Sequence, residues 1–292
     1  MSSQRHDAAE HTALGPMTIV AVDQHEDVPV VRDKLACRML PATGKAAVAA
    51  TAVALVRRQL IAATEKKIPG LWASILCRKR YIDDQLRAAW RDGIDVAVVL
   101  GAGLDTRAYR VPDPTAVHFY EVDLAESRDG KRECLRRLYG KVPDHVTLVA
   151  ADLETRDPIK ALVACGYDPA RRTVFVCEAV TQYLSEDAVR RMFSSLASVP
   201  PGSRLVFTYV RKDFLDGVAL YGAEQVYREY VLERGLWHFG IHPENVATFL
   251  AEYGWLEIDQ AGPREYAERY LGPLNRPSPV SGIELSVVAE KR

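Results

Sequence analysis

The sequence predicts an α/β fold: a seven-stranded, mostly parallel sheet with an antiparallel last strand, an N-terminal helical region and an inserted helical lid. Two observations lead to this prediction. Runs of β-branched and aromatic residues alternate with helical segments through the middle of the chain, and this alternation is typical of crossover connections in a parallel sheet. The last two strand-like runs have no helical pattern between them, which predicts an antiparallel pair.

The N-terminal third is predicted to be helical. Residues 1–40 carry few periodic signals, and we expect about the first 25 to be poorly ordered, as free termini usually are. Residues 45–92 are rich in Ala, Leu and Arg, and their helical pattern stops at Gly93. The apolar stretch 46–56 is too short to span a membrane, so we interpret it as a buried helix.

The strand-like runs are short, rich in Val, Phe and Tyr, and flanked by turn-forming or charged residues, as strands of a buried sheet are. The seven runs are DVAVVL (95–100), VHFYEVD (117–123), VTLVAAD (146–152), TVFVCEAV (173–180), RLVFTYV (204–210), 255–260 and 283–289.

Two helices in this part of the chain have clear end signals. Ser185, followed by two acids, is an N-cap candidate, and Pro243 can open a helix that Gly254 closes. The stretch 211–242 is too long for a simple connection and is rich in Tyr and Trp, which favours an inserted lid. We therefore predict a single domain over 1–292. Its four parts are a helical region (1–94), a cofactor-binding βαβ core (95–210), the lid (211–242) and a C-terminal helix with a β-hairpin (243–292).

Composition excludes several classes of protein. The chain has 292 residues, with 38 Lys and Arg against 39 Asp and Glu, so its net charge of -1 does not favour nucleic acid as a partner. The five cysteines form no C-x-x-C pair and no metal site is predicted, which fits a reducing cytoplasm. The N-terminus has no apolar core of a signal peptide, and we expect no membrane partner.

The first strand ends in a glycine-containing loop, LGAGLDTRAYR (100–110). Gly101 and Gly103 allow a sharp turn and a close approach of the backbone to a ligand, at the sheet edge where open α/β folds bind small molecules. Thr106 stands where the dinucleotide fingerprint has its third glycine. Asp123 ends the second strand 20 residues after Gly103, the spacing of a ribose-binding acid. This is a Rossmann-like arrangement.

Three acids end three successive strands: Asp123, Asp152 and Glu178. A carboxylate within the apolar run around Glu178 is costly to bury, so it either meets a cation or donors, or lies at the exposed end of its strand. We expect the three acids to converge on one crevice. Because no His accompanies them, a cofactor with a ribose, an adenine amine and a positive centre suits them better than a metal.

These segments carry a family resemblance. GAGLDTRAYR, FYEVDL (119–124), AADL (150–153) and VFVCEAVTQYL (174–184), in this order, resemble the leucine carboxyl methyltransferase and polyketide O-methyltransferase superfamily, which uses S-adenosylmethionine. RKRYIDD (78–84) is similar to the R-x-R-x-x-D stretch that precedes the first strand in this family. The resemblance covers about residues 43–290.

The resemblance implies roles for individual residues. Arg78 would contact the methionine carboxylate, with Arg80 a nearby second candidate, and Gly101 would lie under the methionine moiety. Asp123 would accept the ribose hydroxyls. Glu178 would face the amino group or the sulfonium. The adenine would be held by Asp152 through a hydrogen bond and by Leu153 through packing.

The predicted function is that of an S-adenosylmethionine-dependent O-methyltransferase that forms a methyl ester on a small-molecule, natural-product-type carboxylic acid. A carboxylate is ionised at pH 7 and needs no general base. A phenol or hydroxyl acceptor, the alternative, would benefit from a base, and His242, His238 and Tyr183 are the candidates. A nicotinamide-dependent reductase and a catalytically silent nucleotide-binding module are rival interpretations. The sequence does not indicate the acceptor or the oligomeric state.

Overall fold

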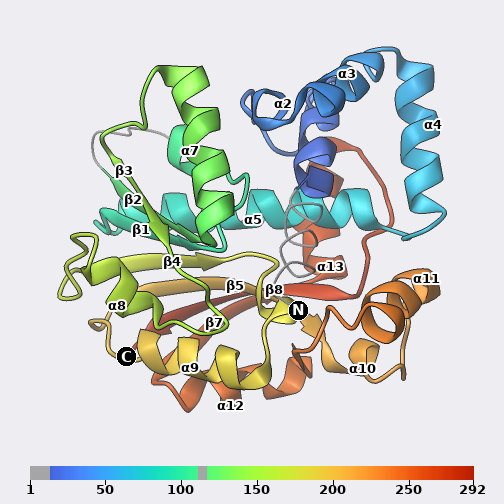
Figure 1. Cartoon of the computed structure of the whole chain (residues 1–292). Helices are drawn as coiled ribbons and strands as arrows, with labels where there is room; N and C mark the ends of the chain where they lie inside the picture. The colour runs from blue at the N-terminus through green and yellow to red at the C-terminus, as the bar shows by residue number, and fades with distance from the viewer. Residues whose placement is uncertain (1–13, 111–116) are drawn as a thin grey trace.

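The computed structural model describes residues 14–110 and 117–292. Its centre is a sheet with the strand order β3-β2-β1-β4-β5-β8-β7 (Figure 1). The strands are β1 (Val96–Leu100), β2 (His118–Asp123), β3 (Val146–Ala150), β4 (Thr173–Cys177), β5 (Arg204–Arg211), β6 (Gly240–Ile241), β7 (Trp255–Ala261) and β8 (Glu284–Lys291). The pairs among β1 to β5 are parallel, and β8 is antiparallel to both β5 and β7. The reversed last strand was therefore predicted correctly.

Over residues 14–110 and 117–292 the sheet has eight strands and not the seven that we predicted. The additional strand, β6, has two residues and pairs in parallel with the end of β5. It lies within the segment 211–242, where we expected only a helical insertion. Two residues are too few to produce a period-2 pattern, so no local signal could predict this strand.

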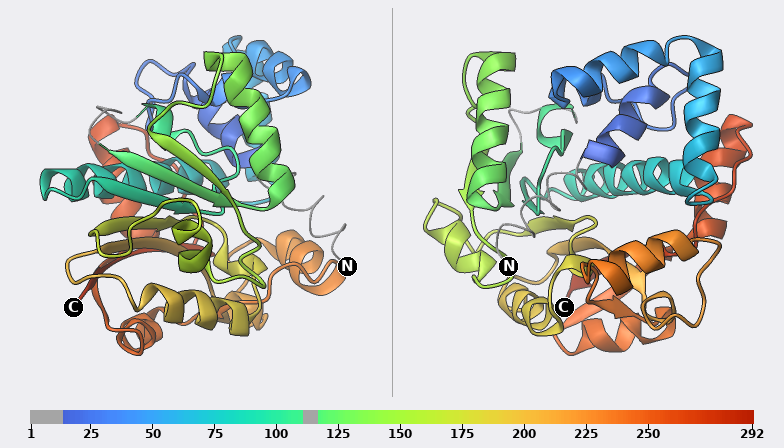
Figure 2. Two further views of the ribbon diagram at one scale, coloured as in Figure 1. Left: turned by 60° about the vertical axis from the view of Figure 1, so that its left-hand side comes forward. Right: turned by 45° about the vertical axis from the view of Figure 1, so that its right-hand side comes forward.

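Helices cover both faces of the sheet (Figure 2). They are α2 (Ala36–Met39), α3 (Ala42–Ala50), α4 (Ala54–Glu65), α5 (Leu71–Arg91), α6 (Arg107–Arg110), α7 (Ala125–Tyr139), α8 (Pro158–Val163), α9 (Glu186–Leu196), α10 (Lys212–Leu215), α11 (Glu224–Val226), α12 (Val246–Ala251) and α13 (Pro263–Tyr266). Short 3-10 and π turns add η1 (Thr181–Tyr183), η2 (Tyr227–Glu233), η3 (Pro243–Asn245), η4 (Ala267–Leu271) and η5 (Gly272–Leu274).

Alternate residues of each strand face two separate cores. In β1, Ala97 and Val99 pack with α5 and the N-terminal helices, whereas Val96, Val98 and Leu100 pack with α8, α9 and α12. All five residues of β1 are buried, as the continuous apolar run predicts for a strand covered on both faces. The helix α9 is capped by Ser185, whose side chain accepts a hydrogen bond from the Ala188 N–H, as expected.

The start of the described chain is more ordered than predicted. Residues Leu14–Asp23, within the part that we expected to be poorly ordered, form an apolar helix whose Val20, Ala21 and Val22 are almost fully buried. This helix packs into the same core as α5, and that long-range contact is invisible in a local pattern.

The apolar stretch 46–56 is not one buried helix. It is divided between α3 and α4, which are bent by 112° at the break around Thr51, and Val53 and Leu55 are 60% and 65% exposed. Over the described residues, no single helix is long and apolar enough to cross a membrane, although α3 and α4 taken together satisfy that length and composition.

The connection from β7 to β8 is also more helical than predicted. We expected no helix between the last two strands, but α13, η4 and η5 follow one another there. Each is only three to five residues long, and Pro263, Gly272 and Pro273 interrupt the periodicity that a longer helix would show. The two strands nevertheless pair antiparallel, as expected.

Candidate active site

The loop after β1 forms a cradle at the carboxyl edge of the sheet. Gly101 has φ +69°, and a Cβ atom at this position would lie 2.3 Å from Cγ2 of Val180. The Gly101 N–H donates a hydrogen bond to the Val122 carbonyl at 2.8 Å, which ties the loop to β2. Only glycine combines this backbone conformation with this approach, so the predicted close turn is present.

Asp123, at the end of β2, fastens the same loop. One carboxylate oxygen accepts a hydrogen bond from the Gly103 N–H and the other accepts one from the Leu124 N–H at 2.7 Å. Burial raises the pKa of Asp123, and these backbone hydrogen bonds offset only part of that effect. Further hydrogen bonds from hydroxyl donors would stabilise the charged form of this buried carboxylate.

Asp152 and Leu153 lie next to Asp123 across the sheet. The Ala151 N–H donates to the Asp123 carbonyl at 2.8 Å, so the chain leaves β3 directly beside the end of β2. Asp152 accepts a hydrogen bond from the Glu154 N–H at 2.9 Å, and Leu153 is buried. The carboxyl ends of β2 and β3 therefore bring these residues to one edge.

Glu178 directly follows β4 and is surrounded by cations. Its carboxylate is 2.8 Å from Arg78 Nε, 3.1 Å from Lys79 Nζ and 2.7 Å from Arg107 Nη1. Burial alone would raise the pKa of Glu178, but Lys79, Arg107 and Arg78 together hold it well below its usual value. Of the alternatives for this acid, the structure shows the first: it meets cations, and its side chain is only 7% exposed although it lies one residue past the end of β4.

Arg78 projects from α5 between two carboxylates. Its Nε donates to Glu178 and its Nη1 to Glu284 of β8, and neither contact uses Nη2. Arg80, the second candidate, instead pairs with Asp84 at 3.1 Å and is 43% exposed. The structure thus associates Arg78, and not Arg80, with the end of β4.

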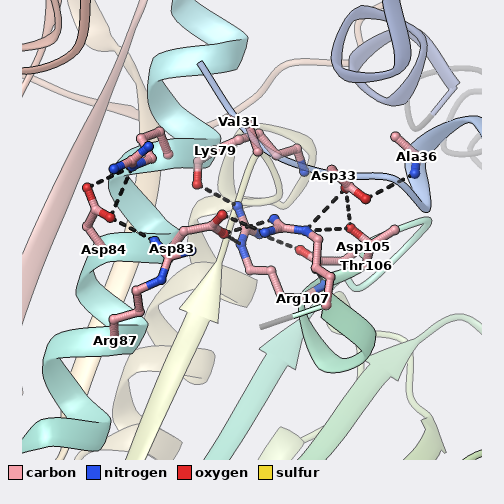
Figure 3. Close-up of polar contacts among 12 residues, drawn as sticks. Val31, Asp33, Ala36, Lys79, Asp83, Asp84, Arg87, Asp105, Thr106 and Arg107 are labelled. Atoms are coloured by element: carbon pink, nitrogen blue, oxygen red, sulfur yellow. Dashed lines mark hydrogen bonds and ion pairs between the residues drawn. The ribbon is translucent and has the colours of Figure 1, made fainter. Parts of the chain in front are cut away.

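Arg107 also lies beside Glu178, and the sequence patterns did not indicate it. It is fully buried and pairs with Asp83 of α5 and with Asp105 of its own loop (Figure 3). It also pairs with Glu178. Its neighbour Arg110 also binds Asp83, at 2.6 Å. The signal was available, because Arg107 and Asp83 both lie within the segments that carry the family resemblance.

The three candidate bases lie beyond β4 and in the 211–242 segment. Tyr183 is in η1, and its ring meets that of Trp237 edge to face at 6.4 Å. The His238 N–H donates to the Gln182 carbonyl at 2.7 Å, and the His238 side chain is exposed. His242 is half-buried. Across residues 14–110 and 117–292, no three His, Cys, Asp or Glu side chains are grouped so that they could hold a metal ion.

A solved structure shares this fold. The crystal structure of a provisionally named methyltransferase from Thermobifida fusca matches with a TM-score of 0.59 at 22% identity, over 81% of this chain and 88% of that one. The parallel sheet with its reversed β8 and the glycine cradle after β1 define the class of fold: a Rossmann-like α/β sheet.

Sequence comparison gives the family. The model of the leucine carboxyl methyltransferase family matches residues 13–197, and the protein belongs to this family. A relative from Streptomyces avermitilis is 33% identical over 205 residues, which cover 70% of this chain and 69% of the relative. One from Frankia alni is 29% identical over 271 residues, covering 91% and 89%. Both are provisionally named S-adenosyl-L-methionine-dependent methyltransferases, and the protein is a methyltransferase that uses this cofactor.

Proposed function

We propose that the protein is an O-methyltransferase that esterifies a small-molecule carboxylic acid, with S-adenosylmethionine bound along the carboxyl ends of β1 to β4. The observation that carries the proposal is the placement of Arg78 at the end of β4, beside a glycine cradle that Asp123 fastens. The description of the family as carboxyl methyltransferases supports a carboxylate acceptor.

The residues at this edge fit the cofactor. The absent Cβ of Gly101 makes room for Val180, and the left-handed turn at φ +69° presents bare backbone that can lie against the methionine moiety. Asp123 can accept ribose hydroxyls, and Asp152 with Leu153 can hold the adenine by a hydrogen bond and by packing. The Arg78 guanidinium can bind the methionine carboxylate through Nη2, because Nε and Nη1 already have carboxylate partners. Glu178 would face the amino group or the sulfonium.

When bound, the cofactor supplies a methyl group that its sulfonium already activates. The protein then has to align an acceptor oxygen with that group and exclude water. A carboxylate acceptor is ionised at neutral pH, so no residue has to remove a proton. A phenol is the second candidate, because the edge-to-face pair of Tyr183 and Trp237 suits a planar acceptor. The natural-product character of the acid, the lid role of 211–242 and a cytoplasmic location stay predictions.

Calorimetric titration with S-adenosylhomocysteine, and separately with NADH, tests the cofactor site. We expect only the former to bind, and Asp123→Asn to weaken it about tenfold or more, because hydrogen bonds to a charged group contribute about 1.5–3 kcal/mol. Asp144→Asn is the matched control, since this carboxylate is 85% exposed. Binding of NADH alone, or an unchanged dissociation constant for Asp123→Asn, would contradict the proposed site.

A panel of acids and phenols then tests the acceptor. We expect methyl transfer to an acid whose rate is flat between about pH 6 and 9, because both the acceptor and the site are already ionised as required. Transfer to a phenol with a rate that rises with pH would favour the second candidate and a general base.

A further inference from the structure

Four elements are joined by a closed ring of hydrogen bonds next to Arg78. The Ala179 N–H donates to Thr208 Oγ1 on β5 at 2.7 Å, and Thr208 Oγ1 donates to Glu284 Oε1 on β8 at 2.5 Å. Arg78 Nη1 donates to Glu284 Oε2, and Arg78 Nε donates to Glu178 Oε1 at 2.8 Å. Since Glu178 and Ala179 are consecutive, the ring closes through the backbone.

The turn after β4 needs this ring. Ala179 has φ +55°, in the left-handed region that a residue with a Cβ rarely adopts. Such a conformation persists only where the surroundings enforce it, and the hydrogen bond from the Ala179 N–H to Thr208 is one such restraint. Thr208 is fully buried, so its hydroxyl must both accept and donate, and it does.

Glu284 also fixes the guanidinium of Arg78. Burial would lower the pKa of Arg78, but Glu284 and Glu178 raise it above its usual value, so the group stays charged. Because Nε and Nη1 are each held by a carboxylate, the plane of the guanidinium is set and Nη2 is the group left for a ligand.

We propose that Glu284 and Thr208 are positioning residues for the cofactor: they aim Arg78 at the methionine carboxylate and hold the turn that carries Glu178. This inference rests on the proposed role of Arg78. Neither residue belongs to the motifs of the sequence, and Glu284 lies 206 residues from Arg78 along the chain. The effect of each residue on binding should therefore depend on whether the ligand has a carboxylate.

Two ligands that differ only in that group provide the test: S-adenosylhomocysteine and its decarboxylated analogue. For Glu284→Gln we expect the dissociation constant of the former to rise tenfold or more, and that of the analogue to stay within twofold. Thr208→Val should show the same selective loss to a smaller degree, and Thr208→Ser should restore wild-type binding because it keeps the hydroxyl. Glu290→Gln is the matched control on β8, since its side chain is 44% exposed.

The outcomes separate the two proposals. If the wild-type protein binds neither ligand, the proposed cofactor site fails. If the wild type binds both ligands and Glu284→Gln binds both as tightly, the positioning role is overturned. If Glu284→Gln binds both ligands more weakly by the same factor and has a lowered melting temperature, the role of Glu284 is structural and the positioning role is again overturned. Should Glu284→Gln not fold, Thr208→Val and Thr208→Ser decide the question alone. If Thr208→Val binds S-adenosylhomocysteine as tightly as Thr208→Ser does, and the same holds for the decarboxylated analogue, the proposal is overturned.

Discussion

Glu178 shows how one residue can depend on several distant ones. A carboxylate at the end of a buried strand would be costly without partners, and here Arg78, Lys79 and Arg107 supply three cations. Loss of the Glu178 charge removes the carboxylate that Lys79 pairs with, whereas Arg78 keeps Glu284 and Arg107 keeps Asp83 and Asp105. A buried charge left without a partner is the costly event in buried ion pairs. Glu178 is thus structural as well as a cofactor-site candidate.

This arrangement predicts a pH-dependent stability. The pKa of Glu178 is lower in the folded state than in the unfolded state, where it is about 4.5. The contribution of Glu178 to the free energy of unfolding is therefore complete above about pH 4.5 and is lost as the pH falls through the pKa of the folded state. Glu178→Gln should lower the free energy of unfolding by about 3–5 kcal/mol at pH 7, and the difference from wild type should shrink below about pH 4.5. Urea unfolding at several pH values measures this.

The control for this experiment is Glu252→Gln. Glu252 pairs with Arg190 on the surface and its side chain is 50% exposed, so we expect an effect of less than about 1 kcal/mol. A difference between wild type and Glu178→Gln that stays constant from pH 7 to pH 3 would show that the charge of Glu178 is not what stabilises the protein.

At the scale of elements, α3 and α4 differ sharply from α5. The helix α5 buries one face against the sheet, including Tyr81, Ile82 and Leu86. In α3 the only buried side chain is Val48, and α4 has none. The stability of the α3–α4 bend therefore depends on very few contacts.

Alanine substitutions can measure this difference. Val48 is 2% exposed, so Val48→Ala should lower the free energy of unfolding by about 1–3 kcal/mol through lost burial and a cavity. Leu55 is 65% exposed. Leu55→Ala should change the free energy of unfolding by less than about 0.5 kcal/mol, because Ala and Leu are both good helix formers. Chemical denaturation of both variants gives the comparison. An equal loss for Leu55→Ala would mean that this surface is covered in solution.

At the scale of the molecule, the sheet separates two cores that share the same strands. Cys77 belongs to the core on the α5 side and Cys177 to the core on the α9 side. Because β1, β2, β4, β5 and β8 each contribute residues to both cores, loss of one face removes the support of the other. We expect the two cores to unfold as one unit.

The cysteines report on that cooperativity. Burial raises the pKa of Cys77 and of Cys177 to about 12, so at pH 8 almost no thiolate is present to react. Titration with a thiol reagent should give a fast reaction at Cys165, which is exposed, and Cys165→Ser should remove it. With increasing denaturant, Cys77 and Cys177 should become reactive at the same midpoint, as mass spectrometry of labelled peptides can check. Separate midpoints would show that the two cores unfold independently.

The local sequence was sufficient where a short segment determines its own conformation. The glycine cradle at 101–103, the Ser185 cap and the buried strand β1 all depend on residues within a few positions of one another, and all three are present as predicted. Asp123 and Asp152 meet at one edge of the sheet because β2 and β3 are parallel, so the carboxyl ends of the two strands lie on the same side.

Tertiary contacts decided the rest. The helix Leu14–Asp23 is ordered because a distant core receives it, and the segment 46–56 is exposed because no element packs over most of it. The cations around Glu178 and the ring through Thr208 and Glu284 come from segments up to 206 residues apart. The sequence by itself determined the class of fold, the cofactor and the edge that would carry the site. The burial and the fixed orientation of the Arg78 guanidinium depend on partners that only the folded chain brings within hydrogen-bonding distance, because the cost of burying a charge is offset only where its counter-charges meet it in space.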